Sequence, residues 1–292
     1  MKALYTQQTN LPLEYVNLKI KEFLNEDRVP QDLTTQFTLL QKTIIIKADI
    51  IAEQNLIFAG GLIIKSIFRE CDILMLAPDG SQFFPGDKIA TIEGNAKTLL
   101  AKERVLLNLI QRLSGVASLT NKYVKTLNTP SIKILDTRKT TPGLRLFEKY
   151  AVTVGGGYNH RMDLYDGVMF KDNHLTVLDN LKKTLIKLKE KHPNKKIQLE
   201  VDTFNQLESL LHEVDFQNQV DAILLDNMSS KETAQCVELI SSKELNCFIE
   251  ISGGITLDNI KKYKQLKIDG ISIGAITHQA VSKNIKLEFY KE

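Results

Sequence analysis

The chain has 292 residues, 43% of them hydrophobic, and at roughly 150 residues per domain this predicts two domains. Its 38 Lys and Arg against 35 Asp and Glu leave a formal charge of +3, too small to predict a nucleic-acid or membrane partner by bulk attraction. No signal-like N-terminus and no run of about 18 apolar residues occurs, so we expect a soluble protein. Cys71, Cys236 and Cys247 are scattered, which argues against disulfides or structural zinc and favours the cytoplasm.

The first hundred residues combine short strand patterns with helical ones, separated in the later part by turn signals around Gly80 and Gly86. The predicted strands are 43–52, 73–77 and 88–93, and the predicted helices are 13–24 and 60–68. This mixture is typical of a small α+β domain.

A long helical connector is predicted over residues 97–127, where apolar positions recur at helical spacing. We expect Gly115 to interrupt it. Arg104 and Arg112 lie on this helix, and the ordinary interpretation of both is a solvated face.

After Ser131 the pattern changes to short apolar runs that alternate with amphipathic stretches. The runs are 132–135, 167–170, 197–201, 222–225, 248–251 and 270–273. Leucines from Leu175 to Leu188 form a helical stripe, and Ser229 with Glu232 reads as a capping box. Such alternation predicts a parallel sheet, closed or nearly closed into a β/α barrel.

Polar residues follow or end most of these runs, at the barrel end where chemistry is expected. They are Asp136, Arg138, Lys139, Lys171, Asp172, Glu200, Asp226 and Glu250. Each alone is more often a solvated residue or a helix cap, but their recurrence around one mouth predicts a site.

Two glycine segments end the last two strands, Ser252-Gly253-Gly254 and Gly274-Ala275. Glycine lets backbone amides approach a phosphate closely, although tight turns that require positive φ would explain the same residues. The cationic segments 136–145, 155–161 and 171–174 suit a polyanion. No P-loop, dinucleotide-binding turn, Ser-His-Asp set or metal-ligand spacing is present.

Longer segments carry a family resemblance through nearly the whole chain. They are 32–35, 103–108, 114–117, 136–145, 148–152, 155–161, 171–174, 224–227, 252–255 and 271–278. Together they resemble the quinolinate phosphoribosyltransferase family.

The resemblance implies an α/β fold with an N-terminal open-faced α/β sandwich, a C-terminal incomplete β/α barrel, and the division 1–115, 116–280 and 281–292, the last segment returning to the first domain. It implies a pentosyl-transferring glycosyltransferase of NAD biosynthesis that moves phosphoribosyl from 5-phosphoribosyl pyrophosphate to quinolinate with decarboxylation. The expected products are nicotinate mononucleotide, carbon dioxide and pyrophosphate. Magnesium and a homodimer with shared active sites are also implied, and further assembly into a hexamer is left open.

The resemblance also assigns roles by position. The residues expected to hold quinolinate are Arg104, Arg138, His160, Arg161 and Lys171, with Lys139 lining the pocket. Glu200 and Asp226 are expected near the ribose and magnesium, directly or indirectly. The residues expected at the 5-phosphate are Ser252, Gly253, Gly254, Gly274 and His278. Lys139, Lys171, Glu200 and Asp226 are the expected catalytic group, and which lysine assists decarboxylation stays open.

Two alternatives remain at this point. One is the molybdenum-associated relative of the same fold, against which the Lys171-Asp172 pair counts. The other is a barrel that binds phosphosugars without catalysis. Glu200 and Asp226 count against it, because a pure anion binder gains nothing from carboxylates that face phosphates.

Overall fold

The computed structural model describes residues 3–39 and 44–290. The chain forms two compact units that are interleaved along the sequence. We call Met1–Gln7, Lys122–Thr140 and Gly157–His278 the barrel unit, and Gln8–Asn121, Thr141–Gly156 and Gln279–Glu292 the sandwich unit. The linear domain boundaries at 115 and 280 stay a prediction.

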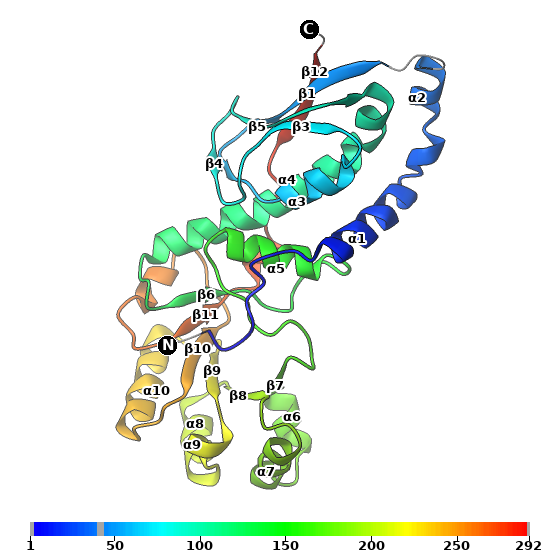
Figure 1. Cartoon of the computed structure of the whole chain (residues 1–292). Helices are drawn as coiled ribbons and strands as arrows, with labels where there is room; N and C mark the ends of the chain where they lie inside the picture. The colour runs from blue at the N-terminus through cyan, green and yellow to red at the C-terminus, as the bar shows by residue number, and fades with distance from the viewer. Residues whose placement is uncertain (1–2, 40–43, 291–292) are drawn as a thin grey trace. The chain divides into compact units, whose positions relative to one another are not determined.

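The sandwich unit is built on a four-stranded antiparallel sheet in the order β12-β1-β5-β3 (Figure 1). Its strands are β1 (Ile45–Ala52), β3 (Asp72–Leu76), β5 (Lys88–Asn95) and β12 (Ile285–Tyr290). The predicted strands of the first hundred residues are confirmed, except that Thr43 lies outside the described residues. Buried and half-buried positions alternate through much of β5, as expected where one face of a sheet covers a core.

Helices and short elements complete this unit. The helices are α1 (Leu13–Glu26), α2 (Leu33–Thr38), α3 (Gly61–Ile67), α5 (Arg145–Val154) and most of α4 (Ala96–Leu127), with the 3-10 turn η1 (Val29–Gln31) and a small sheet of β2 (Leu56–Ile57) and β4 (Gln82–Phe83). The helices expected at 13–24 and 60–68 are therefore confirmed.

Helix α4 runs for 32 residues without a break, so the interruption expected at Gly115 is wrong. A side chain at Gly115 would place its Cβ 2.3 Å from the carbonyl oxygen of Val281. The glycine therefore permits a close backbone approach and leaves the helix continuous.

The barrel unit contains six parallel strands in the order β6-β11-β10-β9-β8-β7. They are β6 (Lys133–Leu135), β7 (Gly167–Phe170), β8 (Lys196–Val201), β9 (Ala222–Asp226), β10 (Phe248–Ser252) and β11 (Gly270–Ser272). All six predicted strands are confirmed. Strands β6 and β7 are the two edges of this sheet, which agrees with an incomplete barrel.

The remaining elements of this unit are α6 (Asp172–Val177), α7 (Leu181–Lys191), α8 (Phe204–Glu213), α9 (Phe216–Gln219), α10 (Ser230–Ser242), η2 (Ile260–Tyr263) and α11 (Ala275–His278). Ser229 and Glu232 form the predicted capping box at α10. The leucine stripe is two helices, because the Asn180 side chain caps a new helix at Lys183.

None of the helices within residues 3–39 and 44–290 has the length and apolar character needed to cross a membrane.

Candidate active site

A pocket of about 300 Å³ lies in the barrel unit. It is lined by Thr137, Arg138, Lys139, His160, Arg161, Met169, Lys171, Glu200, Leu224, Asp226, Glu250, Ser252 and Ser272. Strand register explains part of this lining: Leu224 pairs with Glu200 on one side and Glu250 on the other, and Asp226 pairs with Ser252. Because side chains alternate along a strand, these residues share one face of the sheet.

Arg161 is buried, and its guanidinium donates to the carbonyl of Gly167 at 2.8 Å. Burial, and then the neighbouring charge of Arg138, lowers the pKa of Arg161 below its usual value. Two guanidinium groups held close together at a pocket wall repel each other. An anion with two negative groups would relieve that repulsion.

His160 is held at three points. Its backbone N–H donates to Asp136 Oδ1 at 2.9 Å, and its Nδ1 accepts from the Arg161 N–H at 2.7 Å. Its Nε2 lies 3.1 Å from Gln198 Oε1. Because Nδ1 accepts, the ring proton is assigned to Nε2, which donates toward Gln198.

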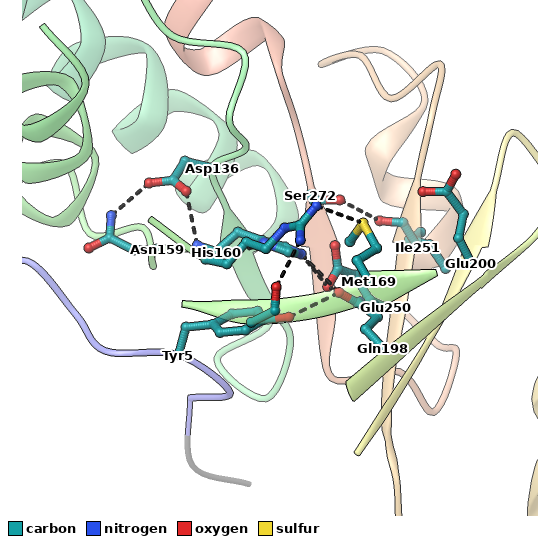
Figure 2. A network of polar contacts seen from close by, with 12 residues as sticks. Tyr5, Asp136, Asn159, His160, Met169, Gln198, Glu200, Glu250, Ile251 and Ser272 are labelled. Atoms are coloured by element: carbon teal, nitrogen blue, oxygen red, sulfur yellow. Dashed lines mark hydrogen bonds and ion pairs between the residues drawn. The ribbon is translucent and has the colours of Figure 1, made fainter. Parts of the chain in front are cut away.

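Glu250 lies fully buried beneath this ring, with Oε2 3.5 Å from His160 Nε2 and 2.8 Å from the donating Gln198 amide. Burial alone would raise the pKa of Glu250. The adjacent His160 and hydrogen bonds from His160, Ser272 and Gln198 outweigh burial and hold that pKa below its usual value. The carboxylate is therefore ionised inside the unit. We call His160, Arg161, Gln198 and Glu250 the histidine cluster; Figure 2 labels His160, Gln198 and Glu250.

Lys171 Nζ contacts both carboxylate oxygens of Glu200, at 2.6 and 2.9 Å. The side chain of Lys171 is 44% exposed and that of Glu200 only 7%. Burial raises the pKa of Glu200, and the charges of Asp226 and Asp202 add to the rise, so the ion pair does not bring it back to the usual value. We call Lys139, Lys171, Glu200 and Asp226 the lysine cluster.

Lys139 is exposed, and its backbone is fixed by a hydrogen bond from Thr277 Oγ1 to its carbonyl at 2.7 Å. A Cβ on Gly274 would lie 2.9 Å from Lys139 Cδ and 3.2 Å from His278 Nε2. The absence of a side chain at Gly274 thus lets these two side chains come together. Gly274 and His278 are not among the residues that line the pocket, and Gly274 lies beside Lys139, which does line it.

Gly253 and Gly254 both have positive φ, 84° and 62°. The turn after Ser252 therefore requires glycine for conformational reasons alone, as the alternative interpretation held. Gly253 also packs against Asn227, whose Oδ1 would lie 2.1 Å from an added Cβ. A phosphate at this turn stays a prediction.

Arg104 belongs to the sandwich unit, where it is exposed on α4 beside a second pocket that Asp27 and Asp32 also line. It is not among the residues that line the barrel pocket. Its predicted role in quinolinate binding stays a prediction.

No group of three or more His, Cys, Asp or Glu within the described residues is arranged to hold a metal ion. Glu200 and Asp226 are two carboxylates at one pocket, and Asp226 is close enough to help raise the pKa of Glu200. Magnesium commonly uses one or two carboxylates together with substrate phosphates, so this donor set fits a magnesium held partly by a substrate.

Comparison with known families identifies what this chain is similar to. The family description "Quinolinate phosphoribosyl transferase, C-terminal domain" matches residues 116–288, and the corresponding N-terminal domain matches residues 32–114. The chain belongs to the quinolinate phosphoribosyltransferase family.

Named relatives of this family resemble the chain along most of its length. A probable nicotinate-nucleotide pyrophosphorylase [carboxylating] from Bacillus subtilis is 38% identical over 281 residues, 93% of this chain and 94% of that protein. The nicotinate-nucleotide pyrophosphorylase [carboxylating] of Mycobacterium leprae is 33% identical and covers 92% and 95%. A solved nicotinate-nucleotide pyrophosphorylase structure from Francisella tularensis gives a TM-score of 0.87 at 31% identity, covering 98% and 100%.

The sequence placed Glu250 among the polar residues around the barrel mouth without giving it a role, and it did not single out Gln198, Ser272 or Tyr5. A signal for Gln198 and Glu250 is present, since the polar residues at 198, 200 and 250 alternate with apolar ones inside two predicted strands. That period places them on one face of the sheet. Nothing in the local sequence around Tyr5 indicates its partners.

Proposed function

We propose that this chain transfers the phosphoribosyl group of 5-phosphoribosyl pyrophosphate to quinolinate. The ring nitrogen forms a bond to C1 of the ribose as the bond from C1 to pyrophosphate breaks. The carboxyl group beside that nitrogen then leaves as carbon dioxide, and its electron pair stays on the ring carbon. A proton on that carbon completes nicotinate mononucleotide.

The observation that carries the proposal is one pocket that holds two neighbouring guanidinium groups together with the neighbouring carboxylates of Glu200 and Asp226. Arg138 and Arg161 would take the two carboxylates of quinolinate, and His160 would fix the backbone and orientation of Arg161. Binding two carboxylates next to an anionic donor requires such cations, because an unpaired buried charge is costly.

Glu200 and Asp226 would act on the donor. As pyrophosphate leaves, the ribose gains positive charge at C1, and carboxylates near it stabilise that charge. Magnesium, held by these residues and the pyrophosphate, would supply neutralisation of the departing phosphates. Lys171 keeps Glu200 oriented through both carboxylate oxygens.

Lys139 would stabilise the electron pair left by decarboxylation. Lys171 is engaged by Glu200, whereas no interaction of the Lys139 ammonium group is found within the described residues. An ammonium group without a fixed partner can turn toward a new negative charge. The 5-phosphate would be bound by Ser252, Gly253, Gly254, Gly274 and His278, which end or follow the paired strands β10 and β11.

A direct assay tests the activity. Purified protein with quinolinate, 5-phosphoribosyl pyrophosphate and magnesium should form nicotinate mononucleotide and carbon dioxide in equal amounts, and chelation of magnesium should stop turnover. The proposal is contradicted if the nucleotide forms without carbon dioxide. It is also contradicted if the folded, unaltered chain, with Lys139 and Glu200 present, forms no product.

We further propose a homodimer in which Arg104 enters the site of the other copy, in the cytoplasm, where the three free thiols would stay reduced. The support is that Arg104 is an exposed cation that does not line the barrel pocket of its own chain. A two-fold dimer would contain two shared sites. Assembly of dimers into a hexamer is compatible with this proposal and is not required by it.

Mixing two inactive variants tests the shared site. Arg104→Ala and Lys139→Ala should each be nearly inactive alone. After unfolding and joint reassembly, about half of the dimers are mixed and one site in each is intact, so about a quarter of all sites should recover. No recovery, with subunit exchange confirmed by mass, means that Arg104 does not act in trans.

A further inference from the structure

Tyr5, in the first described residues, is buried in the barrel unit against His160. The two rings lie 4.7 Å apart at 34°, and the Tyr5 hydroxyl donates to Gln198 Oε1 at 3.2 Å (Figure 2). Gly167 makes room for it, since an added Cβ there would lie 2.5 Å from Tyr5 Cε1. The Tyr5 ring is therefore closely packed between Gly167 and His160.

Gln7 holds the residue that precedes His160. Its Nε2 donates to the Asn159 carbonyl at 3.1 Å, and its Oε1 accepts from the Asn159 N–H at 2.7 Å. This pairing of a side-chain amide with both backbone groups imitates one step of a strand ladder. Asp136 Oδ2 accepts from the Asn159 side chain at 2.7 Å, so the backbone before His160 is fixed from two sides.

The Tyr5 hydroxyl, together with His160 and Glu250, fixes how the Gln198 amide is oriented. Gln198 Oε1 faces two donors, Tyr5 and His160, while its Nε2 donates to Glu250 at 2.8 Å. Reversing the amide would place an NH₂ group against both donors and an oxygen against a carboxylate. Burial raises the pKa of Tyr5, so its hydroxyl stays a donor.

We propose that Tyr5 and Gln7 are positioning residues that keep His160 in its Nε2–H form and hold Arg161 ready for the acceptor acid. Neither residue lines the pocket, so neither touches substrate. They act through His160, whose Nδ1 accepts from the Arg161 N–H. The assignment of the acceptor as quinolinate rests on the proposed function.

Steady-state kinetics of four variants test this role. Tyr5→Phe keeps the ring and loses one hydrogen bond, so KM for quinolinate should rise about threefold to tenfold. Tyr5→Ala and Gln7→Ala should raise it further, roughly tenfold to a hundredfold. KM for 5-phosphoribosyl pyrophosphate should change less than about twofold. Thr6→Ala, an exposed position between the two, is the matched control and should behave like the unaltered chain.

A loss of general stability must be separated from loss of positioning. Phe216→Ala removes a buried ring from α9, whose residues do not line the pocket. It should lower the melting temperature at least as much as Tyr5→Phe and leave KM for quinolinate unchanged. An equal rise in KM in Phe216→Ala, or no rise in either Tyr5 variant, overturns the proposal.

Nitrogen-15 NMR of the histidine rings gives a readout that does not need turnover. The His160 signal, assigned by its absence in His160→Gln, should show a protonated Nε2 and an unprotonated Nδ1. Tyr5→Phe should shift it or mix in the other tautomer. If the unaltered chain lacks transferase activity but shows this dependence, the proposed function fails and the positioning stands. A ring signal that ignores Tyr5 refutes the positioning even in an active enzyme.

Discussion

The two clusters of the barrel pocket solve opposite electrostatic problems. In the histidine cluster every member is buried, with His160 at 5%, Arg161 at 7% and Glu250 at 0% exposure. Side-chain hydrogen bonds join Gln198 to His160 and to Glu250, and the backbone N–H of Arg161 donates to His160. In the lysine cluster Glu200 is also buried, but Lys139 is exposed and Lys171 is half exposed, and one ion pair joins Lys171 to Glu200. One end of the pocket is therefore assembled before substrate arrives, and the other stays open to water.

The difference between the two clusters follows from how much water can stabilise the charges in each. A buried charge needs fixed partners, since leaving it without them costs several kcal/mol. A charge near the surface is stabilised by water and can exchange that water for phosphates or a metal ion. We infer that the histidine cluster sets which acceptor binds, and that the lysine cluster serves the chemical step.

The largest expected effect is rejection of nicotinate. Nicotinate lacks one of the two carboxylates, so one guanidinium of the Arg138 and Arg161 pair stays unmatched, which should lower kcat/KM by about a thousandfold. Competition between the two acids in a single assay measures the ratio. Comparable turnover of nicotinate would show that the arginine pair does not read the second carboxylate.

The next effect concerns stability. Glu250→Ala removes the acceptor that faces Gln198 and His160 and leaves their donors buried, so the free energy of unfolding should fall by about 2–4 kcal/mol. Glu200→Gln breaks an ion pair whose lysine is half exposed, and it should change the free energy of unfolding by less than about 1 kcal/mol. Urea unfolding compares the two. Equal losses would abolish the contrast between the clusters.

Substitutions in the lysine cluster should lower turnover strongly although they change the free energy of unfolding little. Glu200→Gln and Asp226→Asn remove negative charge near the ribose and should lower kcat roughly tenfold or more, while quinolinate binding changes little. Calorimetric titration with quinolinate provides the binding measurement. Weak quinolinate binding with normal kcat would move these acids to the acceptor end.

The smallest effect is a shift in pH dependence. Because the pKa of Glu200 is raised, by burial first and then by Asp226 and Asp202, Glu200 takes up a proton at a higher pH than an ordinary glutamate as the solution is acidified. Protonation ends its pairing with Lys171, so the acidic limb of kcat/KM should lie above the usual glutamate range. Asp202→Asn removes one raising charge and should move the limb slightly to lower pH. If the acidic limb moves to higher pH in Asp202→Asn, the limb does not report the raised pKa of Glu200.

The sequence predicted the secondary structure of both units because periodicity is a local property. Alternating runs such as 197–201 and 248–251 formed parallel strands, and Ser229 with Glu232 formed the expected cap. Local rules failed at Gly115 and at the leucine stripe. At Gly115 the reason for the glycine is the close approach of the Val281 backbone, which is far away in the sequence. In the leucine stripe, Asn180 caps a new helix, although the spacing of the leucines alone predicts one continuous helix.

The sequence by itself determined the family, the barrel and the residues of opposite charge around its mouth, because their spacing and type are written in short segments. Only the tertiary structure decided which of them are buried and what each one contacts. Tyr5 and Gln198 are 193 positions apart, yet one hydrogen bond joins them. The pairing depends on chain closure through the core, and no local pattern records which distant side chains a folded core brings within 3.2 Å of each other.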